Sequence, residues 1–186
     1  FFFSTQLGMI LFLCDALGHC AVIHWRSWKS KRVVRSVLAG ETVAYTATND
    51  YAYTLGHELG VILGLRIPID LFTDSKSLCD LLTTVTIPSE KRLAIDVAAG
   101  RQAYALNEID NIGLLTSASN PSNPHTKKAD CPILSKAVEH GQLHLTLRKC
   151  IIHAQDNNNM ADRTPPFPHT MTHSSSSPTP LPPHPP

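Results

Sequence analysis

A strand-like run that leads directly into a helix-like segment, near the middle of the chain, most limits how this sequence can fold. Residues 67–72 are mostly apolar and predict a short strand, and Asp74 precedes a segment in which Leu78, Leu81 and Leu82 recur at helical spacing. In α/β proteins, ligands and catalytic groups collect at the carboxyl ends of strands. Asp74 is therefore a candidate for metal binding or acid–base chemistry, although an aspartate here can also simply cap the next helix.

The amino-terminal part of the chain predicts a β-hairpin. Residues 9–14 and 21–25 are apolar runs joined by a short turn that contains Gly18. The first residues are also apolar, but they have no basic leader, and Asp15 follows too early for a membrane span of about 20 residues. We therefore expect a core strand here, and neither a signal peptide, a transmembrane segment nor a membrane partner.

The other predicted elements complete an α/β pattern. Helical spacing recurs over residues 39–65, and Glu41 lies at the start of this predicted helix, where a glutamate can simply complement the helix dipole. Four more elements follow: a helix over residues 90–106 capped by Ser89, a strand over residues 109–116, a helix over residues 131–140 between Pro132 and Gly141, and a short strand at residues 143–147. This order predicts an antiparallel hairpin that leads into a mixed sheet with helices on its faces.

Composition divides the chain into two regions. Residues 1–150 contain the predicted strands and helices, whereas residues 151–186 are rich in proline, serine and histidine, with nine of the 14 prolines from residue 165 onward. A segment of that composition cannot build a core. We therefore predict one domain over residues 1–150 and a disordered tail over residues 151–186.

The cysteines indicate a reducing environment. There are five of them, an odd number, and none has the CxxC spacing of a zinc or redox site. We expect free thiols, no disulfide partner and an intracellular location, in the cytoplasm or the nucleus. The sequence also lacks a glycine-rich phosphate loop and a Ser-His-Asp or Cys-His signature, which argues against a small-molecule enzyme.

A local basic segment is the main indication of a nucleic-acid partner. Five of the ten residues from 26 to 35 are basic, while the net charge of the whole chain is only +1. This pattern is typical of a nucleic-acid-binding edge, with cations for phosphates and an aromatic ring for stacking, but an exposed third strand explains it equally well. The candidate nucleic-acid-binding residues are Arg26, Trp28, Lys29, Lys31, Arg32 and Arg35.

Five stretches, in this order, resemble the ribonuclease H-like domain of copia-type retrotransposon polyproteins. They are residues 4–8 (STQLG), 28–42 (WKSKRVVRSVLAGET), 71–78 (LFTDSKSL), 90–96 (EKRLAID) and 120–121 (NP). The resemblance implies a ribonuclease H-like sheet and hydrolysis of the RNA strand of RNA–DNA hybrids at two Mg²⁺ ions, with Mn²⁺ as a substitute. It also implies two partners, an RNA–DNA hybrid or another nucleic acid, and the remainder of a polyprotein.

The same resemblance assigns the site residues. Glu41 and Asp74 match two of the family's four acidic positions, and both are expected to bind metal, whereas Asn123 stands where the family has an aspartate. The first aspartate belongs ahead of residue 4, so we expect the first strand to be incomplete, and Asp15 in the hairpin turn is not expected to replace it. With two positions missing or substituted, we expect an inactive nuclease-type domain; the alternative is a non-catalytic nucleic-acid-binding or interaction module.

Overall fold

The computed structural model describes residues 5–84, 87–127 and 130–152. Within them the chain is a mixed α/β protein with two separate sheets, an antiparallel pair and a mixed three-stranded sheet, flanked by helices. The predicted tail lies outside the described residues, apart from Ile151 and Ile152, which belong to the last strand. None of the described helices combines the length and the apolar content that crossing a membrane requires.

The predicted hairpin is confirmed and is longer than expected. Strands β1 (Gln6–Cys14) and β2 (Cys20–Lys29) pair antiparallel, with a register shift between Leu11 and Phe12. Asp15 stabilises the turn, because its Oδ1 accepts hydrogen bonds from the backbone N–H groups of Leu17 and His19. The exposed third strand that we considered for the basic segment does not form: residues 26–29 are the end of β2, and residues 30–36 are a loop.

Helix α1 (Val37–Leu63) confirms the long predicted helix within two residues at each end. Ser36 caps it by accepting a hydrogen bond from the Ala39 N–H at 3.1 Å, and Gly64 ends it in the left-handed conformation with φ 67°. Our placement of Glu41 in the first turn was wrong, since that turn contains no acidic residue and Glu41 is one position beyond it. A dipole role at the helix terminus therefore does not explain this glutamate.

The second sheet follows the predicted order with shifted boundaries. Strand β3 (Asp70–Thr73) pairs parallel with β4 (Asn111–Leu115), and β5 (Leu147–Ile152) pairs antiparallel with β4. The terminal strand therefore begins at the last residue of the predicted stretch 143–147. Only the part of each apolar run that lies beside a partner strand becomes a strand, which is why β3 and β4 are shorter than predicted.

The helices around this sheet show two differences in capping. Helix α2 (Lys76–Thr83) is capped by Ser75, whose Oγ accepts from the Leu78 N–H, so Asp74 is not its cap. Helix α3 (Ala94–Ala105) follows a 3₁₀ turn over Lys91–Leu93, and neither start has a side-chain cap, so the predicted Ser89 cap was wrong. Helix α4 (Pro132–His140) ends at Gly141, as predicted.

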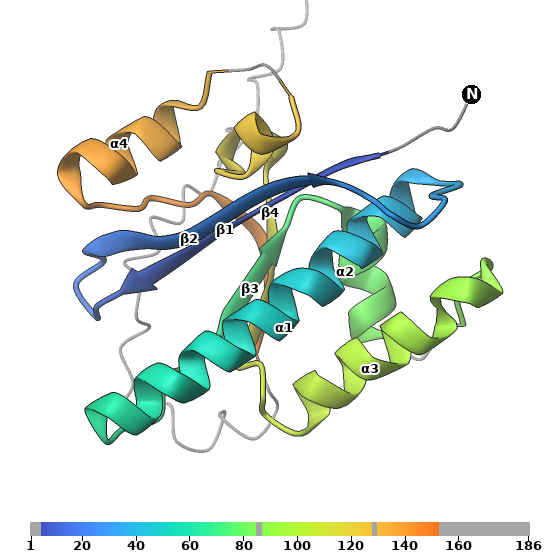
Figure 1. Cartoon of the computed structure of the whole chain (residues 1–186), viewed down its shortest axis with the longest axis horizontal. Coiled ribbons are helices and arrows are strands. Elements are labelled where there is room, and N and C mark those ends of the chain that lie inside the picture. The colour runs from blue at the N-terminus through green and yellow to red at the C-terminus, as the bar shows by residue number, and fades with distance from the viewer. Residues whose placement is uncertain (1–4, 85–86, 128–129, 153–186) are drawn as a thin grey trace, which may run out of the picture.

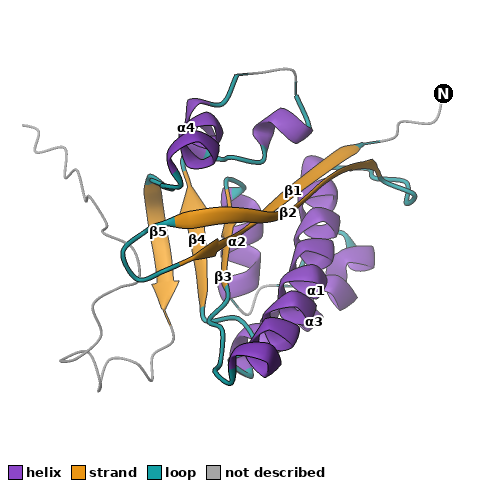
Figure 2. Cartoon of the chain, turned by 60° about the vertical axis from the view of Figure 1, so that its left-hand side comes forward, coloured by secondary structure: helices purple, strands orange, loops and turns teal. Residues whose placement is uncertain are grey.

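The helices lie on two opposite sides of the hairpin. Helices α1, α2 and α3 lie together below the hairpin, while α4 lies above it (Figure 1). The largest core cluster joins α1, α2 and the second sheet through Tyr45, Leu71, Leu78, Leu82, Ile109 and Ile112. A smaller cluster of Cys20, Ala137 and Leu143 holds α4 against the hairpin. Figure 2 shows the hairpin crossing the direction of β3, β4 and β5.

Candidate functional site

The three predicted site residues Glu41, Asp74 and Asn123 line one cleft. This cleft has a volume of about 1030 Å³ and lies between the start of β1, the loop over residues 30–36, the first turns of α1 and the loop that follows β4. Asp74 reaches it from the carboxyl end of β3, just before α2. Residues far apart in the sequence, Glu41 and Asp74 among them, therefore line the same cleft.

Glu41 lies within the electrostatic influence of Asp74. The pKa of Glu41 is raised above its ordinary value of 4.5, chiefly because the side chain is buried and then because the Asp74 charge is close. Lys127, on the far side of the cleft, acts in the opposite direction and lowers the pKa of Glu41. A like-charged pair of this kind is stabilised by any cation that can bind between its members.

Ser117 links Asp74 to Asn123. Its hydroxyl donates a hydrogen bond to Asp74 Oδ2 at 2.7 Å, and its backbone carbonyl accepts one from Asn123 Nδ2 at 2.6 Å. The hydrogen bond to Ser117 uses the amide nitrogen of Asn123, so the amide oxygen is the atom that can act as a metal ligand. We did not predict Ser117, although it lies two residues after the end of β4, and adjacent parallel strands end at the same edge of a sheet.

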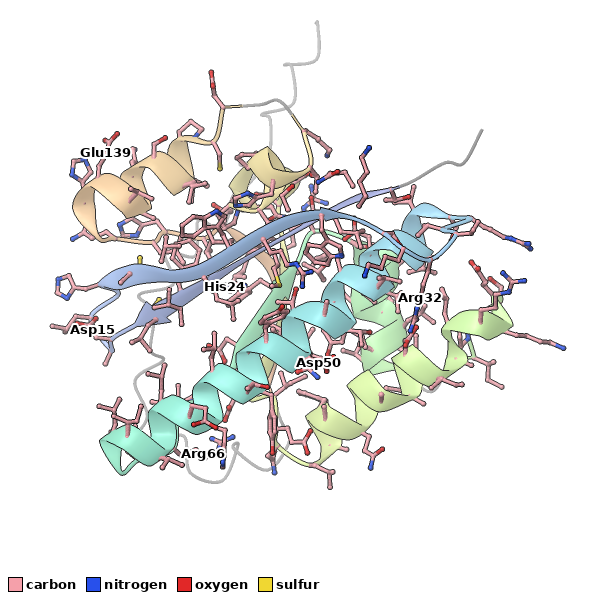
Figure 3. The ribbon with its side chains drawn as sticks, viewed as in Figure 1. Asp15, His24, Arg32, Asp50, Arg66 and Glu139 are labelled. Carbon is pink, nitrogen blue, oxygen red and sulfur yellow. The ribbon has the colours of Figure 1, made fainter. Side chains whose placement is uncertain are left out.

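The donor set suits one hard divalent cation better than two. Two carboxylates and an amide offer oxygen atoms, and Mg²⁺ is typically bound by one or two carboxylates while it keeps several waters. Among residues 5–84, 87–127 and 130–152, no group of three or more His, Cys, Asp or Glu side chains is placed to hold a metal. Asp15 does not supply a third carboxylate, because it lies at the hairpin tip beside His19, far from Arg32 in Figure 3.

Three of the predicted nucleic-acid-binding residues line the same cleft. Lys31, Arg32 and Arg35 lie along the loop after β2, and Lys127 adds a cation from the opposite side. Arg32 also forms an ion pair with Asp96 at 3.1 Å, which ties this loop to α3. Lys127 was missed by the sequence analysis, because only the fold brings residues 120–127 next to α1.

Arg26 and Trp28 make a different set of contacts. Arg26 Nη1 donates to the Tyr51 hydroxyl at 2.8 Å, and its guanidinium lies over the rings of Trp28 and Tyr51, at 5.1 and 5.7 Å from their centroids. The ring of His24 also stacks on Tyr51, with the two ring centroids 5.0 Å apart. These contacts hold β2 against α1, so both residues have a structural role in the folded chain.

The structure describes the side chains of four of the five cysteines. Cys14, Cys20, Cys79 and Cys131 form no disulfide. Comparisons of the whole chain with protein-family models, with curated proteins and with solved structures give no match.

Proposed function

We propose that this chain is a ribonuclease H-like domain of the copia-type retrotransposon class that binds nucleic acid and one divalent cation without cleaving the RNA strand. One observation carries the proposal: the acidic residues Glu41 and Asp74 and the substituted position Asn123 converge in a single cleft with a cationic rim. The order of the elements, a hairpin, a long helix, a strand, further helices and a closing strand, supports the same class.

The acidic centre of the cleft supports binding of a single ion. Glu41 is partly buried with a raised pKa beside Asp74, so a bound Mg²⁺ or Mn²⁺ would relieve both the repulsion and the burial of negative charge. Glu41 and Asp74 would hold the ion, which would supply positive charge for a phosphate of the nucleic acid. Asn123 adds an oxygen but no charge, which leaves too few carboxylates for the two ions that activate water and stabilise the leaving oxygen.

The rim supports contact with phosphates. Lys31 and Arg35 on one side and Lys127 on the other flank the acidic centre. Backbone phosphates would pair with these cations, a contact that gives affinity without sequence specificity and that weakens as salt rises. The acidic centre would thus bind the cation, and the rim would bind the nucleic acid.

The proposal is tested with a fluorescent RNA–DNA hybrid in the presence and absence of Mg²⁺. We expect salt-dependent binding that Mg²⁺ strengthens, no RNA product, and loss of the Mg²⁺ effect in Asp74→Asn. Asp50→Asn is the matched control, because Asp50 is exposed on α1 and does not line the cleft. RNA cleavage that Asp74→Asn abolishes would show an active nuclease instead, and no binding even at low salt would overturn the proposal.

A further inference from the structure

Two cysteines stand opposite each other at the closed end of the hairpin. Cys14 is the last residue of β1, Cys20 is the first residue of β2, and the two are direct partners in the register. In the adjoining turn, the Asp15 N–H donates to the His19 carbonyl at 2.9 Å, which is the contact of a hydrogen-bonded pair. The two kinds of pair alternate along an antiparallel ladder, so Cys14 and Cys20 are a non-hydrogen-bonded pair. The Cys20 N–H accordingly points away from β1 and donates to the Gly141 carbonyl at 2.7 Å.

A pair of this kind brings its two side chains close together. Opposite Cα atoms in a non-hydrogen-bonded pair are about 4.5 Å apart, which falls within the range of about 4.4–6.8 Å that disulfides span. The thiols of Cys14 and Cys20 also contact each other. Burial raises the pKa of Cys14 to about 12, and Cys20 adds to this shift by its charge and by a side-chain hydrogen bond. An S–S bond can therefore form here without a change of register.

The turn between the two cysteines is already held in place by Asp15. Its Oδ1 accepts from the N–H groups of Leu17 and His19, and its Oδ2 pairs with His19 Nδ1 at 2.8 Å. The fold thus holds the ends of this short loop together before any covalent bond exists. Closing the loop with a disulfide therefore costs little conformational entropy in the folded chain, whereas the unfolded chain loses all of the loop-closure entropy.

The surroundings of the pair make its two members unequal. Cys20 is only 8% exposed and packs against Ala137 of α4 and against Leu143, while Cys14 lies at the edge of this cluster and is partly exposed. A small molecule in solution therefore reaches Cys14 first. The Cys20 thiol is placed to react with Cys14 and is covered against solvent.

We propose that Cys14 and Cys20 form a redox site, which a low-molecular-weight disulfide converts reversibly into a cross-strand disulfide. With glutathione disulfide, the Cys14 thiolate attacks one sulfur, the S–S bond of the oxidant breaks, and one glutathione leaves with a proton. The Cys20 thiol then loses its proton and attacks Cys14 Sγ in the mixed disulfide, which releases the second glutathione. In total the two protein thiols lose two electrons and two protons, and glutathione disulfide becomes two thiols. Excess glutathione reverses both steps.

The oxidised form should be the more stable one, because the new bond mainly constrains the unfolded chain. For a loop of about seven residues, the unfolding equilibrium constant should fall by about 50-fold. By linkage, the fold should favour formation of the disulfide by the same factor. The reaction should be slow near pH 7, since only the thiolate attacks and the raised pKa keeps Cys14 protonated. The site therefore responds to sustained oxidation.

The test uses the full chain in glutathione buffers of known ratio, with and without urea. The first lysine or arginine in the sequence is Arg26, so trypsin releases both cysteines in one peptide, residues 1–26, which a disulfide makes lighter by two hydrogen atoms. Mass spectrometry after acid quenching gives the oxidised fraction at each ratio. We expect an equilibrium constant about 50-fold larger for the folded chain than for the chain in urea. Oxidation should raise Tm by about 5–10 °C.

Three variants locate the reaction. In Cys20→Ser, the mixed disulfide between Cys14 and glutathione should accumulate, because no second thiol releases it. In Cys14→Ser, the covered Cys20 should stay unmodified. Cys131→Ser is the matched control, since Cys131 lies before α4 with its thiol against the Asn120 carbonyl, and peptide 1–26 should oxidise as in the original chain. Circular dichroism checks that each variant is folded.

Three results would overturn the proposal. The first is that peptide 1–26 of the folded chain keeps both thiols at ratios that oxidise the unfolded chain. The second is an equilibrium constant that is equal for the folded and unfolded chains. The third is accumulation of the Cys14 mixed disulfide in the original chain, which would show that Cys20 does not reach it. The assay contains neither nucleic acid nor metal, and the candidate site lies at the other end of β1, so the outcome is independent of the proposed function.

Discussion

The two sheets differ sharply in how deeply their residues are buried. In β4 every residue but the first is buried, whereas in β2 only Cys20 is, and the hairpin exposes large side chains such as Trp25, which is 63% exposed. The second sheet with α2 and α3 thus carries most of the hydrophobic core, and the hairpin leads into the charged loop beside the cleft. The candidate site between the two sheets therefore takes the Asp74 carboxylate from the end of a buried strand and cations from the exposed loop after the hairpin.

The largest difference between the two sheets is expected in how much a core substitution lowers the free energy of unfolding. Ile112 of β4 is 1% exposed and Ile23 of β2 is 39% exposed. We expect Ile112→Ala to lower the free energy of unfolding by about 2–5 kcal/mol, because it removes buried atoms and leaves a cavity. Ile23→Ala should lower it by less than about 1 kcal/mol. Urea unfolding of both variants measures this, and equal losses would contradict the comparison.

The rim cations should affect binding and leave stability largely unchanged. If Lys31 and Arg35 each contact a phosphate, the double variant Lys31→Ala/Arg35→Ala should reduce the slope of log K against log salt by about 2. Lys136→Ala is the control, since Lys136 is exposed on α4 and does not line the cleft. Anisotropy titrations at several salt concentrations give the slopes. An unchanged slope in the double variant would remove this loop from the binding surface.

The acidic centre should make stability depend on pH. The pKa of Glu41 is raised in the folded state, chiefly by burial, so the fold favours its protonated form. Its contribution to stability is therefore complete below the unfolded pKa of about 4.5 and is lost as pH rises through the folded pKa. Glu41→Gln should remove this loss. The gain in the free energy of unfolding of Glu41→Gln over the original chain should therefore be larger near pH 7 than near pH 4.

Two measurements check this prediction. Urea unfolding of the original chain and of Glu41→Gln across this pH range compares the two profiles, and parallel profiles would contradict it. NMR titration of the Glu41 carboxyl carbon in Asp74→Asn separates the two causes of the shift. We expect the pKa of Glu41 to fall when the Asp74 charge is removed, yet to stay above its ordinary value, because burial is the larger cause.

The smallest effect is expected where the loop after the hairpin meets the rest of the molecule. Arg32 pairs with Asp96 of α3 at 3.1 Å, but the Arg32 side chain is 70% exposed. Arg32→Ala should therefore lower the free energy of unfolding by less than about 1 kcal/mol, and the difference should shrink at high salt. Arg92→Ala, an exposed arginine in the turn before α3, is the control. A loss above about 2 kcal/mol would mean that this contact is a major link between the two regions.

Much of the fold was predictable because local chemistry determines it. The apolar runs of the hairpin, the leucines of α2, and Pro132 with Gly141 at the ends of α4 act on neighbouring backbone. The errors occurred where another part of the chain decides. Ser89 has a capping side chain, but the helix begins farther on, after a 3₁₀ turn. The basic segment was compatible with a third strand, but its residues 26–29 pair with β1 as the end of β2, and residues 30–36 are a loop.

The sequence by itself determined the order of the elements, because spacing and residue type record local periodicity, and its resemblance to a known family implied Glu41 and Asp74 as site residues. Only the tertiary structure decided which groups meet. It placed Ser117 and Lys127 beside the two carboxylates, and it set Arg26 against Tyr51 instead of the cleft. It also brought residues of β1 and β3 to the lining of one groove. Such contacts join residues far apart in the chain, and they depend on how helices pack on sheets, which local spacing does not encode.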